Sequence, residues 1–211
     1  MIPPTRYFYS ALMSLWMSLC RAALYTVFVV SSTAYATSVV EVTLEEMLQN
    51  SALVFEGQVI GVQVRENGNR DIQTLLTFEI IDVIKGEVQG SKITLGFLGG
   101  ELAGRKLSVS AMQMPALHER GIYFVESPGR KQVQPLYGWS QGHLRLEQDP
   151  AGTERVFTSS GRPVKGVVQT NGKRSGLLST GAARGLTVGT PDEVSAALGK
   201  KEFKRLLRAA Q

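Results

Sequence analysis

The sequence predicts an all-β fold built around a small barrel, and three observations support this prediction. Within residues 51–86, alternating apolar residues mark two long strands. Between them lies an Asn67-Gly68 pair of the kind favoured in tight hairpin turns. The apolar pattern of the first strand changes phase near Gly57 and Gly61, and glycines inside strands often mark bulges or bends. We therefore expect a long, coiled first strand that contributes to both halves of a barrel.

The two strands differ in how regular their patterns are. A regular strand cannot present both of its faces to one core, because each residue step flips the side chain to the other face. The second strand alternates cleanly, with one apolar face formed by Ile72, Thr74, Leu76, Phe78 and Ile80. The first strand carries two opposed sets, Leu53, Phe55 and Val59 on one face and Ile60, Val62 and Val64 on the other.

Residues 1–36 have the features of a secretory signal peptide. They contain two arginines, an apolar run and no acidic residue. Ala34 and Ala36 fit the A-x-A cleavage pattern, so we expect cleavage before Thr37. An uncleaved membrane anchor is the alternative, and Arg21 in the middle of the apolar span disfavours it. The mature chain is thus expected to be periplasmic or secreted, with no integral membrane span.

Cysteine content and charge narrow the class of protein further. Cys20 is the only cysteine and lies in the predicted signal peptide. The mature chain therefore lacks disulfides, thiol catalysis and thiolate metal sites, which fits an exported bacterial envelope protein of this size. The formal net charge of +5 includes the two arginines of the signal peptide. Residues 200–208 account for all of the remaining excess and the rest of the mature chain is near neutral, so we expect no nucleic-acid partner.

The mature chain divides into three predicted segments. Residues 37–158 form the barrel domain, residues 159–189 a Gly-rich linker, and residues 190–211 a C-terminal amphipathic helix that begins near Thr190-Pro191-Asp192-Glu193. Thr43 and Glu46 predict a capping box that opens a short helix over 44–50. The other predicted elements are strands at 92–98, 106–110 and 122–126, and an added hairpin of strands 144–147 and 155–158.

Several segments of the sequence resemble those of a known family. These are SALVFEGQVIGV, IIDVIKG, ITLGFLGG and GIYFVES, within residues 39–127. In this order they resemble netrin-like modules, which are OB-type barrels also found in tissue inhibitors of metalloproteinases, and uncharacterised exported bacterial proteins with the same run. The resemblance implies an OB-like, five-stranded barrel with a short N-terminal helix, an added hairpin and a C-terminal helix. The inhibitors bind a protease zinc through an N-terminal cysteine, and Thr37 cannot supply that ligand.

One motif carries a possible catalytic signal. Gly138-Trp139-Ser140-Gln141-Gly142 matches G-x-S-x-G, the nucleophile elbow of α/β hydrolases. That elbow needs a parallel sheet with crossover helices, followed by an acid and then a histidine. Only His143 follows, three residues after the serine, and the pattern around it is not alternating strand and helix. We expect a glycine-framed turn with no catalytic residue.

Three residues are candidates for a binding site. Tyr137 and Trp139 predict an aromatic contact patch, with packing in the core as an equal alternative. His143 alternates with Leu144 and Leu146, so it is expected on a solvated strand face that it shares with Arg145 and Glu147. A metal site needs His143 and His118 to converge with a carboxylate, and their spacing does not indicate one. We expect no metal and no cofactor.

These observations favour a non-catalytic binding module of the bacterial cell envelope, whose partner is an envelope protein or a glycan. Two alternatives remain open. One is an envelope hydrolase that uses the segment around Ser140. The other is a protease inhibitor that acts through the mature N-terminus, which rests on the family resemblance alone.

Overall fold

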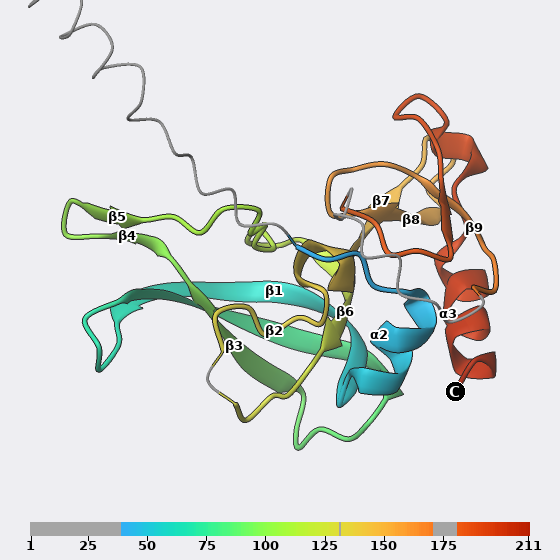
Figure 1. Cartoon of the computed structure of the whole chain (residues 1–211). Helices are drawn as coiled ribbons and strands as arrows, with labels where there is room; N and C mark the ends of the chain where they lie inside the picture. The colour runs from blue at the N-terminus through green and yellow to red at the C-terminus, as the bar shows by residue number, and fades with distance from the viewer. Residues whose placement is uncertain (1–38, 131, 171–180) are drawn as a thin grey trace, which may run out of the picture. The chain divides into compact units, whose positions relative to one another are not determined.

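The computed structural model describes residues 39–130, 132–170 and 181–211, so the predicted signal peptide lies outside the described residues. The described chain is mostly β, with a six-stranded antiparallel sheet in the order β3-β2-β1-β6-β7-β8 (Figure 1). Its strands are β1 (Leu53–Glu66), β2 (Ile72–Lys85), β3 (Lys92–Leu98), β6 (Arg120–Val125), β7 (His143–Gln148) and β8 (Glu154–Thr158).

Two helices and two small hairpins complete the described part of the chain. The helices are α2 (Leu44–Asn50) and α3 (Lys200–Ala209). One hairpin pairs β4 (Gly100–Leu102) with β5 (Arg105–Leu107), and the other pairs β9 (Val164–Val167) with β10 (Leu186–Val188). Single 3-10 turns occur at η1 (Trp139–Gly142) and η2 (Val194–Ala196).

Helix α2 has the predicted bounds and the predicted cap. The Thr43 hydroxyl accepts a hydrogen bond from the Glu46 amide at 3.0 Å, and the Thr43 amide donates to the Glu46 carboxylate at 3.0 Å. This reciprocal capping box satisfies backbone donors that a helix start leaves unpaired. Leu44, Met47 and Leu48 are buried beneath the helix. The capping-box prediction is therefore confirmed.

Strand β1 contains the predicted irregularity, but with a different consequence. Its pairing with β2 shifts register between Val59 and Gly61, so Ile60 is the extra residue of a bulge. Val62 then lies opposite Leu76, on the same face as Val59. The bulge thus restores the phase of the strand. The inference that Ile60 and Val62 serve a second half-barrel is wrong, because these side chains are 37% and 48% exposed.

The sheet is open in the described residues, where no closed barrel forms. Strands β3 and β8 are its two edges, and β7 and β8 form the predicted added hairpin, which extends the sheet beside β6. The prediction of a mostly β protein is confirmed. The prediction of a closed five-stranded barrel is not, because no other strand of the described chain pairs with the outer side of β3.

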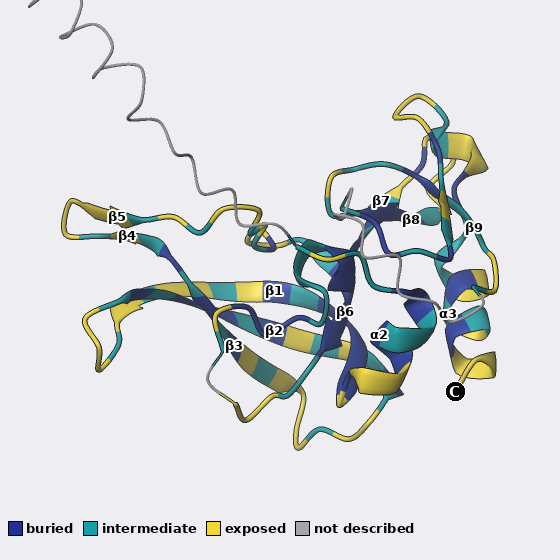
Figure 2. Cartoon of the chain, viewed as in Figure 1, coloured by how far each residue is buried: buried dark blue, intermediate teal, exposed yellow. Residues whose placement is uncertain are grey.

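Both faces of the sheet are buried where β1 meets β6. One face packs against α2, α3 and the β9–β10 hairpin, through residues that include Val54, Ile122 and Phe124. The other face holds an aromatic cluster of Phe55, Phe78 and Tyr123, whose ring centroids lie 4.7 to 5.7 Å apart. Figure 2 shows β6 buried along most of its length, whereas the tip of the β1–β2 hairpin is exposed.

The C-terminal part of the chain differs from its expected organisation. Strands β9 and β10 lie at the two ends of the expected linker, on either side of residues 171–180, which are outside the described residues. Helix α3 begins only at Lys200. The single turn η2 does not continue into it, because the chain is extended at Ala197 and Gly199. Between these two residues, the Leu198 carbonyl accepts a hydrogen bond from the Val156 amide of β8 at 3.0 Å.

Candidate functional site

Strand β3 has backbone groups that point away from the sheet. The carbonyl of Ser91 and the amide of Gly99 bond to β2, at 2.8 and 2.7 Å, so odd-numbered residues of this strand face β2. Leu98, an even-numbered residue, donates its amide outward to the carbonyl of Val133 at 2.9 Å. Because antiparallel strands alternate in this way, Thr94 and Gly96 also direct their N–H and C=O groups outward.

The other edge of the sheet is covered by the chain itself. The amide of Val156 in β8 donates to Leu198, and that of Thr158 donates to the Arg162 carbonyl at 2.8 Å. Bridges from β8 to Pro163 and Gly199 continue this cover. At the β3 edge, the only such bond between strand and loop in the described residues is that of Leu98. The chain therefore covers the β8 edge more completely than the β3 edge.

A groove runs along the β3 edge, and we call it the β3-edge groove. Its first part, about 340 Å³, is lined by residues that include Thr94, Leu95 and Gly96 of β3 and the loop 127–130. Its second part, about 540 Å³, lies against the turn between β1 and β2. Both parts share the side chains of Arg65, Gln73 and Gln132. The groove is thus one continuous surface in this part of the fold.

The turn at the far end of the groove is held by Asn67. Its side-chain oxygen accepts hydrogen bonds from the amides of Asn69 at 2.9 Å and Asp71 at 3.0 Å. Arg70 has a positive φ of 62°, so the left-handed residue of this turn is Arg70. This arrangement projects the polar side chains of the turn beside the groove.

One buried polar group of the groove lacks a partner in the described part of the chain. The Gln132 side-chain oxygen is buried and accepts no hydrogen bond there. The amide of Gln73 lies across Gly96, since a Cβ at Gly96 would lie 2.3 Å from the Gln73 Nε2 atom. A buried acceptor without a donor costs free energy, and a bound ligand can supply the donor. The groove therefore offers amide chemistry that fits a hydrogen-bonding ligand.

The residues predicted to bind lie elsewhere in the structure. Tyr137 packs against the core beside α2, and its hydroxyl accepts a hydrogen bond from the Asn50 amide group at 3.1 Å. Trp139 is half-buried with a positive φ of 62°. His143 is 2% exposed, so the expectation that it is solvated is wrong. A binding role for Tyr137, Trp139 and His143 stays a prediction.

His143 belongs to a buried polar cluster on the aromatic face of the sheet. Its ring stacks on Tyr123 with centroids 5.3 Å apart, and its Nε2 atom contacts the Glu119 carboxylate at 2.5 Å. Burial, together with the negative charge of Glu119, raises the pKa of Tyr123 far above its usual value. Neither the groove nor Ser140 touches this cluster in the contacts that the structure describes, so we assign it to the core.

The Gly138–Gly142 motif has a structural function. Gln141 is fully buried, and its side chain accepts from the amide of Val42 and donates to the carbonyl of Val40, each at 3.0 Å. It also donates to the Gly138 carbonyl at 3.0 Å. The motif leads from a left-handed glycine into η1 and then β7, which is not the strand–turn–helix context of a nucleophile elbow.

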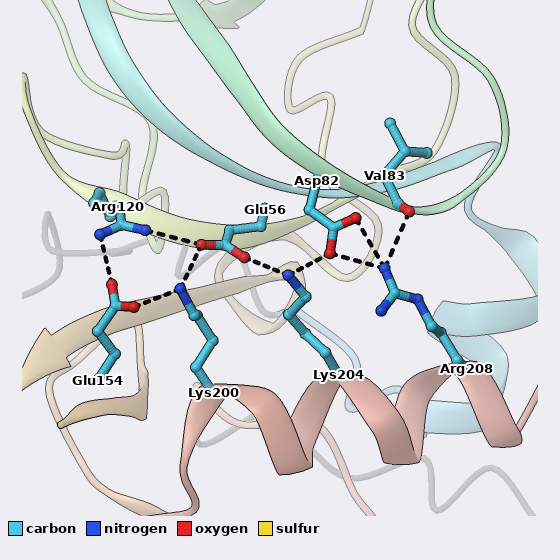
Figure 3. A network of polar contacts seen from close by, with 8 residues as sticks. All are labelled: Glu56, Asp82, Val83, Arg120, Glu154, Lys200, Lys204 and Arg208. Carbon is cyan, nitrogen blue, oxygen red and sulfur yellow. Dashed lines mark hydrogen bonds and ion pairs between the residues drawn. The ribbon is translucent and has the colours of Figure 1, made fainter.

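Helix α3 docks on the sheet through a network of ion pairs (Figure 3). Lys200, Lys204 and Arg208 lie one helical turn apart and point toward carboxylates of the sheet. Lys204 contacts both Glu56 and Asp82. The other pairs are Lys200 with Glu56 and Glu154, Arg208 with Asp82, and Arg120 with Glu56 and Glu154.

Glu56 is the centre of this network. Its side chain is 1% exposed and is bound by three cations. Burial by itself raises the pKa of Glu56, but hydrogen bonds from Lys204 and Lys200 outweigh it and hold the pKa below its usual value. A charged carboxylate is therefore retained in the interior because it is fully paired. This network holds α3 in place and is not open to a ligand.

The described residues contain neither a metal-ligand cluster nor a membrane-spanning helix. No cluster of three or more His, Cys, Asp or Glu side chains there could hold a metal ion. No helix there is long and apolar enough to cross a membrane.

Comparison with known proteins found no matching family model, no similar curated protein and no similar solved structure.

Proposed function

We propose that residues 37–211 form an exported binding module of the bacterial cell envelope, and that its ligand, an envelope protein or a glycan, binds in the β3-edge groove. The observation that carries this proposal is that the chain covers one edge of the sheet and leaves most of the other edge uncovered. The chain covers β8 and leaves Thr94 and Gly96 of β3 facing a polar groove. Open strand edges are normally protected, so an uncovered one indicates a contact surface.

The features of residues 1–36 support export, and the resemblance to netrin-like modules supports a small β domain of the OB-like type. The short capped helix, the bulged first strand and the long second strand occur in the order that this resemblance implies. An OB-like barrel that is opened at β3 remains part of this proposal.

Neither of the two alternatives gains support from the described residues. Ser140 lies in η1 beside the buried side chain of Gln141, and the ring of His143 contacts Glu119. Near the N-terminus, Val40 and Val42 are bound by Gln141. We therefore do not propose a hydrolase or an inhibitor that acts through its N-terminus.

Site-specific photocrosslinking tests the proposal. The mature chain carries p-benzoylphenylalanine in place of Gln132 in the groove, or in place of Ala151 in the exposed β7–β8 turn as a control. We expect light-dependent adducts with envelope proteins from position 132 and not from position 151. A glycan ligand would instead give glycan-array binding that Arg65→Ala abolishes.

Two results would contradict the proposal. One is the absence of both adducts and glycan binding. The other is equal adduct formation from the groove and from the control turn, since that would indicate non-specific contact.

A further inference from the structure

We propose that the ligand of the β3-edge groove is an extended, acidic segment of a partner protein, which binds as an additional strand along β3. This inference rests on the proposed function and deepens it. In strand addition, main-chain hydrogen bonds to an open sheet edge supply affinity, and nearby side chains supply specificity. The β3 edge offers both in one place.

The backbone of β3 defines where the added strand lies. Thr94 and Gly96 each direct one donor and one acceptor outward, with the alternation that an antiparallel or parallel neighbour requires. The bond from Leu98 to Val133 closes the edge at one end, so the open stretch is Thr94–Gly96.

The lining of the groove favours main-chain recognition over a small-molecule ligand. Small-molecule sites are lined mostly by hydrophobic and aromatic side chains. No Phe, Tyr or Trp is among the described residues that line either part of the β3-edge groove. The lining instead contains amides, hydroxyls and charges, and the unpaired Gln132 oxygen can accept from a peptide N–H.

The charge of the groove lining indicates which kind of peptide segment binds there. The part of the groove beside Thr94 and Gly96 is lined by Arg65 and Arg130, and its described lining contains no acidic residue. Arg130 already pairs with Glu126 at 2.7 Å, so Arg65 is the main candidate to meet a carboxylate of the ligand. Arg65 lies on the same face as Gln73, directly opposite it in the sheet. An aspartate or glutamate of the added strand therefore has a cation within the groove.

A selection experiment tests this inference. Random linear octapeptides displayed on phage are selected on the mature chain, and the enriched peptides are synthesised. We expect enrichment of Asp or Glu within otherwise extended sequences. A single backbone N-methyl group at the centre of such a peptide removes one main-chain donor and should weaken binding roughly tenfold.

Two pairs of variants locate the binding edge. Thr94→Pro removes an outward N–H that β2 does not use, and proline is tolerated on edge strands, so binding should fall roughly tenfold or more. Thr94→Ala keeps that N–H and should bind as the parent does. Arg65→Glu should weaken acidic peptides, whereas Arg65→Gln should weaken them less. Thermal unfolding of each variant establishes that it is folded.

The outcomes separate this inference from the proposed function. No enrichment, or peptides that are indifferent to both N-methylation and Thr94→Pro, would overturn strand addition. If Thr94→Pro does not fold, the N-methyl series on the parent chain decides the question. Photocrosslinks from position 132 that persist in Thr94→Pro would retain the groove as a binding surface while removing this mode of binding.

Discussion

Single side chains decide how the motif around Ser140 is used. Serine is the residue that a G-x-S-x-G pattern draws attention to, yet the residue with structural consequence is its neighbour. Gln141 joins three backbone groups, two of them about a hundred positions earlier in the chain, with all its bonds at 3.0 Å. The signal that was available in the sequence was a polar residue between two glycines. Its partners could not be read from the sequence, because they are remote in the chain.

The first prediction concerns the hydrogen bonds of the Gln141 side chain. Gln141→Leu has similar volume but leaves the amide of Val42 and the carbonyl of Val40 without their partners. Because both bonds are only partly buried, each lost hydrogen bond should cost about 0.5–1.5 kcal/mol, so the free energy of unfolding should fall by about 1–3 kcal/mol. Urea unfolding followed by tryptophan fluorescence measures this. Ser140→Ala is the matched control and should change stability by less than about 0.5 kcal/mol. If the two variants lose equal free energy of unfolding, the structural role of the Gln141 hydrogen bonds is contradicted.

At the scale of elements, β1 shows how glycine sets the course of a strand. Gly57 and Gly61 look equivalent in the sequence, since both flank the change of phase. The structure distinguishes them. A Cβ at Gly57 would lie 2.7 Å from the Phe55 ring and 2.8 Å from the Glu79 carbonyl oxygen, whereas a Cβ at Gly61 would lie 3.6 Å from the Cβ of Thr77. Gly57 is therefore required for packing, and Gly61 is not.

The second prediction follows from this difference. Gly57→Ala forces a clash with a buried ring and with the backbone of β2, so it should cost about 1–3 kcal/mol of stability. Gly61→Ala fits its space and restricts the unfolded chain, so it should be neutral or stabilise by up to about 1 kcal/mol. Chemical unfolding of both variants under the same conditions provides the comparison. A stable Gly57→Ala protein would show that the ring of Phe55 moves freely, contrary to its burial.

At the scale of the whole molecule, α3 closes one face of the sheet. Phe203 and Leu207 are fully buried in the core beneath it, and the ion pairs of Lys200, Lys204 and Arg208 flank that contact. Both apolar packing and paired charges therefore join the last residues of the chain to strands near its start. The stability of the molecule should depend on the ionisation of the carboxylates in this contact.

The third prediction gives the sign of that dependence. The pKa of Glu56 is lowered from 4.5 in the folded protein, because hydrogen bonds from lysines outweigh the effect of burial. The pKa of Asp82 is lowered from 3.8, because hydrogen bonds from Lys204 and Arg208 outweigh the effect of burial. A lowered folded pKa contributes stability that is complete above the unfolded pKa and is lost as pH falls through the folded value. The free energy of unfolding should therefore decrease below about pH 5.

A variant isolates the part due to Glu56. Glu56→Gln leaves Lys200, Lys204 and Arg120 without their shared carboxylate and should cost about 3 kcal/mol at pH 7. Its stability should also fall less steeply between pH 5 and pH 3, in roughly the proportion that Glu56 contributes. Lys201→Gln, an exposed position of the same helix, is the control and should follow the parent. Parallel pH profiles for Glu56→Gln and the parent would exclude Glu56 as the titrating group.

Local patterns determined much of this protein. The capped helix over 44–50, the strand over 92–98, the second hairpin and the bulge near Gly61 all follow from residues close together in the chain, because caps, alternation and turns are short-range. Tertiary structure alone decided the open sheet, the docking of α3, the burial of His143 and the groove at β3. Each of these features depends on which strands become neighbours. A sheet edge, a buried charge and an unpaired amide arise only when segments that are remote in the chain pack together.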